Sequence, residues 1–223
     1  GFWAPASKKF KAADVEAAGA AGAIFKLFAT VSIFWALFDQ HGSSWVLQAQ
    51  QMDLNVLGVR FKASQIAALN PLMVMGLIPL FAYGVYPGIE KLFGIAMTPL
   101  RRMSVGMVLT ALSFVAAGLV QAALDRGNTI SVSWQFIQYM LITVSEVMIS
   151  ITGLEFAYTQ APRSMKSTIM SFWLLTVFVG NMITAWIAAI NVFKGASFFF
   201  FFAGLMAAVS VIFIWSAARY KPR

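Results

Sequence analysis

Long apolar runs separated by short polar segments dominate this chain. Four of the runs contain no charged residue, and each reaches the length of about 20 residues at which an α-helix crosses the hydrocarbon core of a bilayer. These runs are Ile66–Ile89, Met103–Leu124, Ser167–Phe193 and Gly195–Ala218. A soluble domain would interrupt such runs with polar positions, so the pattern predicts an all-α, polytopic membrane protein.

Two further runs have a similar length, but each carries an acid near its middle. Asp39 is the only charged residue between Lys26 and Asp53, and Glu146 lies in an apolar run that begins near Trp134. Together the runs predict six transmembrane helices, at approximately Ala23–Met52, Ile66–Ile89, Met103–Leu124, Trp134–Tyr158, Thr168–Val192 and Ser197–Ala217. We therefore expect a six-helix bundle over residues 23–218, between a cytoplasmic linker at residues 1–22 and a cytoplasmic tail at residues 219–223.

Composition narrows the functional classes. Hydrophobic residues make up 60% of the 223 positions and charged residues 11%, against about a quarter charged in a typical soluble domain. Cysteine is absent, which excludes disulfides, thiolate metal sites and a cysteine nucleophile. His41 is the only histidine, and no metal-ligand cluster, nucleophile–base pair or phosphate-binding glycine loop stands out in the sequence. The sequence therefore predicts neither an enzyme nor a bound metal or cofactor.

The net charge of +8 would suit a nucleic-acid partner, but its distribution argues against one. With six spans both termini lie on the same side, and twelve basic residues share that side while four lie opposite. Cytoplasmic loops carry the excess of lysine and arginine, so we expect a plasma or cytoplasmic membrane protein with both ends of this segment in the cytoplasm. The twelve are Lys8, Lys9, Lys11, Lys26, Lys91, Arg101, Arg102, Arg163, Lys166, Arg219, Lys221 and Arg223.

Asp39 is the first candidate for chemistry. An ionised acid at the bilayer centre costs roughly 2.5–3.5 kcal/mol on insertion scales, so an acid retained there usually has a function. Trp35 precedes Asp39 by four positions, which places both on one helical face. A carboxyl group balanced between an aromatic wall and a cationic partner can load and release a proton. The alternative is a purely structural ion pair.

Glu146 is the second candidate. Ser150 and Gly153 follow it at spacings that place them on roughly the same face of a regular helix. Such a small, polar stripe can line an aqueous cavity or allow close packing of helices, and only the cavity explains the charge. A carboxylate that faces a cavity suits an ammonium group on a ligand.

Two neutral side chains complete the candidates. Pro71 removes a backbone donor early in the second span, so Asn70 could present its amide to a polar ligand at a broken helix. The alternative is a simple kink. Trp173 lies several residues inside the fifth span, where it could form a wall of the site or act as an interfacial anchor.

Four segments of the chain match one known family in order and spacing. Phe34–Trp45 (Phe-Trp-Ala-Leu-Phe-Asp-Gln-His-Gly-Ser-Ser-Trp) resembles the seventh helix of the proton-dependent oligopeptide transporter family, which belongs to the major facilitator superfamily. Ser145-Glu146 followed by Gly153–Pro162 (Gly-Leu-Glu-Phe-Ala-Tyr-Thr-Gln-Ala-Pro) resembles its tenth. Gln65–Pro71 and Met170–Trp173 agree with its eighth and eleventh helices in order and spacing. The chain therefore resembles the C-terminal half of the fold, in which two six-helix bundles enclose a cavity.

The resemblance implies a role for each candidate. Trp35 would line the peptide pocket, Asn70 would contact the peptide backbone, and Trp173 would form a side-chain wall. Glu146 would bind the free amino terminus of the peptide. Asp39 would be the proton-coupling acid that pairs with an arginine of the other half, although the family often has glutamate there and Asp39 is one methylene shorter.

We therefore expect proton-coupled symport of di- and tripeptides by alternating access. The partners would be peptides, protons as the coupling ion, the lipid bilayer and an N-terminal six-helix half, without nucleic acid. The chain opens on Gly1-Phe2-Trp3 without an initiating methionine, as a piece of a longer protein would. One alternative is a transporter of nitrate or another small solute on the same fold. Another is a membrane scaffold subunit that transports nothing.

Overall fold

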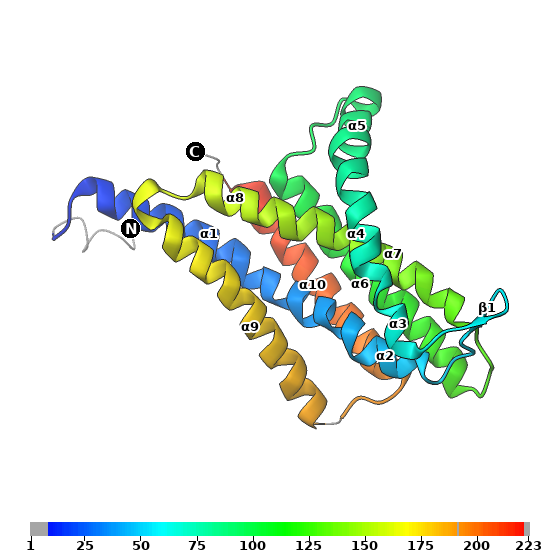
Figure 1. Ribbon diagram of the computed structural model, residues 1–223. Helices are drawn as coiled ribbons and strands as arrows, with labels where there is room; N and C mark the ends of the chain where they lie inside the picture. Colours follow the sequence, from blue (N-terminus) through cyan, green and yellow to red (C-terminus); the bar gives the residue numbers. More distant parts are fainter. Residues whose placement is uncertain (1–8, 191, 221–223) are drawn as a thin grey trace.

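Six membrane-length helical segments form the protein in the computed structural model, which describes residues 9–190 and 192–220 (Figure 1). The first part of the predicted linker, most of the predicted tail and residue 191 lie outside these residues. The segments are Asp14–Ala49, Ala63–Phe93, Pro99–Asp125, Val132–Gln160, Arg163–Ile190 and Ala196–Arg219. The six predicted spans are thus confirmed, and the chain is a multi-pass membrane protein.

The first span is a long helix that breaks at Asp39. Helix α1 runs over Ala12–Phe38, so it begins before the predicted start of the span at Ala23. A 3₁₀ turn, Asp39–Gly42, follows, and the short helix α2, Ser44–Ala49, completes the span. The predicted span with Asp39 near its centre is thus present, and the structure adds a 3₁₀ interruption that begins at Asp39. The break falls where glycine and serine, which stabilise helices poorly, succeed one another.

The second span bends near both of its prolines. Helices α3, Ala63–Ile66, and α4, Leu69–Leu80, are separated near Pro71, where the carbonyl oxygen of Ala67 lies 3.3 Å from the backbone nitrogen of Asn70. Pro79 precedes a π-helical turn, Phe81–Val85, which leads into helix α5, Tyr86–Phe93. Figure 1 shows that α5 projects away from the other helices.

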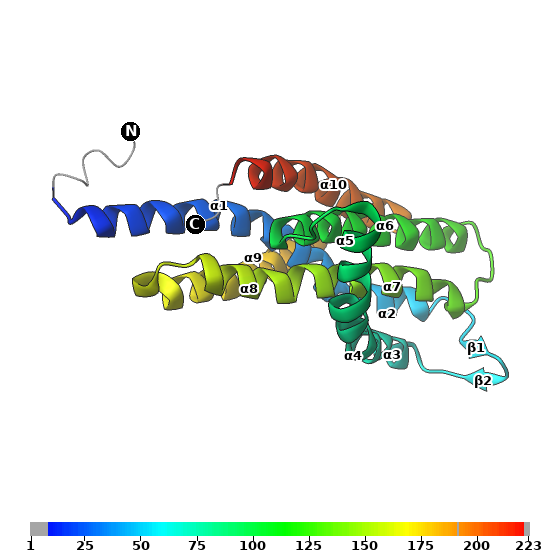
Figure 2. The same cartoon turned by 90° about the horizontal axis from the view of Figure 1, so that it is seen from above.

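The six spans pack against one another in pairs. Helix α6 packs along both α10 and α7, α1 packs along α9, and α4 packs against α7. The start of α1 and the end of α10 lie at one end of the bundle, and a β-hairpin lies at the other (Figures 1 and 2). The elements are β1 (Asn55–Val56), β2 (Val59–Arg60), α6 (Pro99–Asp125), a 3₁₀ turn (Val132–Trp134), α7 (Gln135–Glu146), a π-helical turn (Val147–Ile151), α8 (Thr152–Gln160), a 3₁₀ turn (Arg163–Met165), α9 (Lys166–Ile190) and α10 (Ala196–Arg219).

Helices α1 and α9 approach each other closely at Gly180. A Cβ atom at this position would overlap the carbonyl oxygen of Ser32 and would lie 2.7 Å from the Cβ of Trp35. Only glycine therefore allows the two backbones to meet here. The same contact fixes the distance between the α1 and α9 side chains that neighbour it.

We expect Gly180→Ala to lower the stability of the bundle by about 1–3 kcal/mol, because α9 must move away from backbone atoms of α1. The midpoint of thermal unfolding in detergent would measure the loss. Gly204→Ala is the matched control, since a Cβ there meets nothing within 4 Å. Equal midpoints for the two variants would show that α1 and α9 can move apart at this point without a loss of stability.

A network of buried glutamines ties three spans together near the hairpin end. Gln48 of α2 lies at its centre, and its side chain is 1% exposed. Its Nε2 donates to the carbonyl oxygen of Ala117, at 2.9 Å, and to Oε1 of Gln121, at 3.1 Å. Its Oε1 accepts from Nε2 of Gln135 and of Gln138, each at 3.1 Å. One amide therefore makes four hydrogen bonds that hold α2 to α6 and α7.

Replacing Gln48 by leucine should destabilise the bundle by about 1–3 kcal/mol, because buried amide groups of its neighbours then lose their partners. Thermal unfolding in detergent again provides the measurement. Gln50→Leu, at an exposed position of the same turn, should change stability by less than about 0.5 kcal/mol. A Gln48→Leu protein that unfolds like the wild type would mean that the network contributes no net stability.

Candidate functional site

Asn70 links the broken second span to the acid of the fourth. Its side chain is 6% exposed, and its Nδ2 donates to Oε2 of Glu146 at 2.8 Å and to Oγ1 of Thr143 at 3.1 Å. Glu146 is itself half-buried. The structure thus brings together two predicted site residues that lie 76 positions apart. The bond fixes one carboxylate oxygen of Glu146 and leaves the other available to a ligand.

A change of helical geometry follows Glu146 directly. The π-helical turn Val147–Ile151 widens the helix, so the regular spacing that predicted a stripe through Ser150 and Gly153 does not apply. Ser145 is fully buried, and its Oγ donates to the carbonyl oxygen of Gly106 in α6, at 2.7 Å. Turns of this kind occur frequently at functional sites. Because of this turn, the residues of α8 do not face the direction that a regular helix running on from Glu146 would give them.

Two tryptophans form an aromatic wall on α1 and α9. The rings of Trp35 and Trp173 meet edge to face, with centroids 6.2 Å apart, and Phe28 contacts Trp173 at 4.9 Å. Trp173 is only 2% exposed, so it lies inside the bundle rather than at a lipid interface. Its indole covers Gly153, where a Cβ atom would overlap the ring. Gly153 therefore serves packing, whereas the sequence pattern had favoured a cavity lining.

Asp39 lies where α1 ends, and its carboxylate faces α9. Nδ2 of Asn181 donates to Oδ2 of Asp39 at 2.6 Å. Within the described part of the chain no cationic side chain pairs with Asp39, so the structural ion pair considered above does not form there. Asp39 and Glu146 are close enough for an electrostatic interaction between their carboxyl groups. The two lone acids therefore share one region of the molecule.

The sequence did not single out two polar partners. Thr143, on the turn before Glu146, accepts from Asn70, and Asn181 donates to Asp39. A signal existed for each. Thr143 is three positions from Glu146 and so shares its helical face, and Asn181 is the only amide side chain between Thr168 and Ile190.

The arrangement gathers the groups of a candidate polar binding site. It offers a carboxylate at Glu146 that a hydrogen bond fixes, a carboxylate at Asp39 with an amide donor beside it, and aromatic surface at Trp35. Nε1 of Trp35 has no hydrogen-bond partner among residues 9–190 and 192–220. Over the same residues, no group of three or more potential ligand side chains could hold a metal ion. These groups suit a zwitterionic or cationic organic ligand.

Known proteins with a similar sequence are membrane transporters. The sequence model of the POT family matches residues 3–197. Peptide transporter PTR2 of Saccharomyces cerevisiae is 30% identical over 209 residues, which cover 87% of this chain and 33% of the relative. The relatives found are named as transporters rather than enzymes, as predicted.

Two solved structures share the fold closely. An auto inhibited POT family peptide transporter superposes with a TM-score of 0.87 at 38% identity, covering 98% of this chain and 44% of that one. The POT family transporter PepTSo gives a TM-score of 0.85 at 39% identity, covering 96% and 44%. The predicted fold class is thus confirmed, and the chain spans less than half the length of these proteins.

Proposed function

Because this chain belongs to the POT family, we propose that it forms the C-terminal half of a proton-coupled symporter of di- and tripeptides. The observation that carries the proposal is the carboxylate of Glu146, which Asn70 holds in a half-buried position. The names of the relatives, which are peptide transporters, support the same substrate class.

In this proposal Glu146 binds the free ammonium group of the peptide. A partly desolvated carboxylate forms strong, charge-assisted hydrogen bonds to an ammonium group and repels an anion such as nitrate. Asn70 keeps its Nδ2 on Glu146, and its Oδ1 can accept a hydrogen bond from a backbone N–H group of the peptide. Trp35 and Trp173 then form an apolar wall for a side chain of the peptide. Residues of the N-terminal half complete the cavity.

Asp39 carries the proton in this proposal. When ionised, it pairs with a cationic residue of the N-terminal half, and protonation weakens that pair. The two halves can then rock about the substrate site, which exposes it to alternate sides of the membrane. The amide of Asn181 holds the carboxyl group in place in both states.

The N-terminal half is the proposed partner of the exposed faces of α4 and α9. These two helices are the least buried of the described spans, and both contribute side chains to the site. Their exposed apolar residues need a cover of lipid or protein. They include Leu72, Met75, Leu174, Phe178 and Met182.

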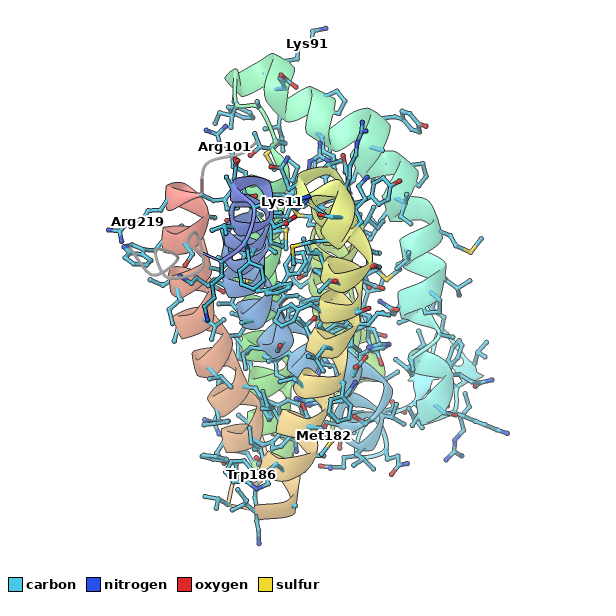
Figure 3. All side chains as sticks on the ribbon, turned by 90° about the vertical axis from the view of Figure 1, so that its left-hand side faces the viewer. Lys11, Lys91, Arg101, Met182, Trp186 and Arg219 are labelled. Atoms are coloured by element: carbon cyan, nitrogen blue, oxygen red, sulfur yellow. The ribbon has the colours of Figure 1, made fainter. Side chains whose placement is uncertain are left out.

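We place the end of the bundle that carries Lys11, Lys91, Arg101 and Arg219 in the cytoplasm of the cell membrane (Figure 3). Trp186 lies toward the opposite end. Because the chain has no cysteine, single cysteines report the orientation directly. An impermeant maleimide added to intact cells should label Asn128→Cys, in the turn at the hairpin end, and should leave Lys91→Cys unlabelled. The reverse pattern would contradict this orientation. Any cysteines of the other half would first be replaced.

Transport itself tests the function. The two halves together, reconstituted in vesicles with an inward proton gradient, should accumulate labelled dialanine above its external concentration. Unlabelled dipeptide should compete and nitrate should not. Competition by nitrate would favour a solute transporter of another class. The absence of both uptake and dipeptide binding would favour a scaffold subunit.

A further inference from the structure

A groove between α1 and α10 lies outside the candidate site. Its volume is about 760 Å³, and its walls come from the N-terminal half of α1 and the last turns of α10. On the α1 side the groove is lined by the small residues Gly19, Gly22 and Ala23 and by the apolar residues Phe25 and Leu27. Trp215 lines the α10 wall, and its side chain is 57% exposed. The groove therefore opens to the surroundings of the bundle.

Two cations from distant parts of the sequence meet at this groove. Lys26 of α1 and Arg219 of α10 both line it, and both side chains are exposed. The guanidinium of Arg219 lies over the ring of Trp215, 3.7 Å from its centroid. Among the described residues neither cation has a carboxylate partner, and no acid lines the groove. The groove thus carries a positive charge that no acid among residues 9–190 and 192–220 neutralises.

The level of the two cations follows from the length of α10. Its 24 residues give a helix of about 36 Å, which exceeds the hydrocarbon thickness of about 30 Å. Arg219 is its last residue and therefore lies at the headgroup region. Lys26 lines the same groove, so it lies at the same level, and α1 continues beyond the end of α10 (Figure 2).

Apolar surface continues from the cations toward the membrane interior. Val211 precedes Trp215 by one helical turn, and its side chain is 67% exposed. The two form a track along α10 on which an acyl chain can lie. Basic pockets between transmembrane helices at the headgroup level bind anionic lipid headgroups.

We propose that this groove binds an anionic phospholipid, with the phosphate between Lys26 and Arg219 and an acyl chain over Trp215. The lipid neutralises both cations and closes the space between α1 and α10. The occupant is a lipid rather than a peptide substrate, because the groove offers an apolar track and two cations but no carboxylate for an ammonium group.

Fluorescence quenching of Trp215 tests the proposal. The N-terminal and C-terminal halves together are reconstituted in phosphatidylcholine vesicles that contain a minor fraction of phosphatidylglycerol. The brominated acyl chains are on phosphatidylcholine in one sample and on phosphatidylglycerol in the other. The contribution of Trp215 is the difference between the wild type and Trp215→Phe. Phosphatidylglycerol should be enriched roughly tenfold at Trp215 over its bulk fraction. In Lys26→Gln/Arg219→Gln that enrichment should disappear.

Lys91→Gln is the matched control, because it removes a cation from the same end of the protein but outside the groove (Figure 3). It should keep the enrichment. Quenching in proportion to the bulk composition in the wild type would mean that the groove has no charge selectivity and would overturn the proposal. If neither brominated lipid quenched the fluorescence of Trp215, the proposal would be overturned as well, since protein and not lipid would then fill the groove. Neither readout depends on peptide transport.

Discussion

Glu146→Gln is expected to weaken dipeptide binding by about 2–5 kcal/mol, which is at least roughly thirtyfold in Kd. Glutamine keeps the size of the side chain and can still accept the hydrogen bond from Asn70, so the site should retain its shape. What it loses is the negative charge opposite the ammonium group of the peptide. Calorimetric titration of the transporter with dialanine would measure the change.

Two comparisons separate this charge effect from a general disturbance of the site. Glu155→Gln, at an exposed position of α8, should bind dialanine like the wild type. An N-acetylated dipeptide has no ammonium group, so its weak binding should change little in Glu146→Gln. If the mutation weakened both peptides equally, Glu146 would support the structure of the site without contacting the amino terminus.

Asp39→Asn should abolish accumulation of peptide while sparing its exchange. A gradient of one pH unit stores about 1.4 kcal/mol per proton, so a single coupled proton can concentrate peptide about tenfold. Without a titratable group at this position, the accumulation ratio should fall to about one. Exchange of labelled against unlabelled dialanine needs no net proton movement and should continue. Uptake by vesicles with and without the proton gradient would measure both.

Glu90→Gln is the control for this variant, because it removes an exposed acid of α5 far from the site. It should accumulate peptide normally. Asp39→Asn vesicles that still concentrate dialanine would assign proton coupling to another group. The simultaneous loss of exchange would show instead that Asp39 is needed for the conformational change itself.

Hydropathy predicted the six spans because the bilayer imposes a length and an apolar character on any helix that crosses it. It did not predict how each helix runs inside its span. The π-helical turn after Glu146 leaves the local apolar character unchanged, so no feature of the hydrophobic run marks it. The end of α1 at Phe38 is followed by the polar run Asp39–Ser44, but a hydropathy average over a whole span does not resolve it. Both features place site residues, which is why the spans were easier to predict than the geometry.

The main polar groups of the site could also be recognised in the sequence, from isolated charges and from a proline within the apolar runs. Asp39 and Glu146 stand out because ionised groups are rare in such runs, and Asn70 stands out beside Pro71. Their partners depend on contacts between helices that are far apart in sequence. The bond from Asn70 to Glu146 and the bond from Asn181 to Asp39 exist only because α4 meets α7 and α9 meets α1.

The π-helical turn at Val147–Ile151 has a consequence for engineering and for homologous chains. Such a turn holds one residue more than an α-helical turn, and each residue rotates a helix by about 100°. Deleting a single residue there would convert the π-helical turn into an ordinary α-helical turn. The segments on both sides would keep their register, so Glu146 would still face Asn70 and Gly153 would still lie under the indole of Trp173. A deletion in a regular part of the same span would instead rotate everything after it by about 100°. A length difference of one position is therefore tolerated at this turn and not elsewhere in the span.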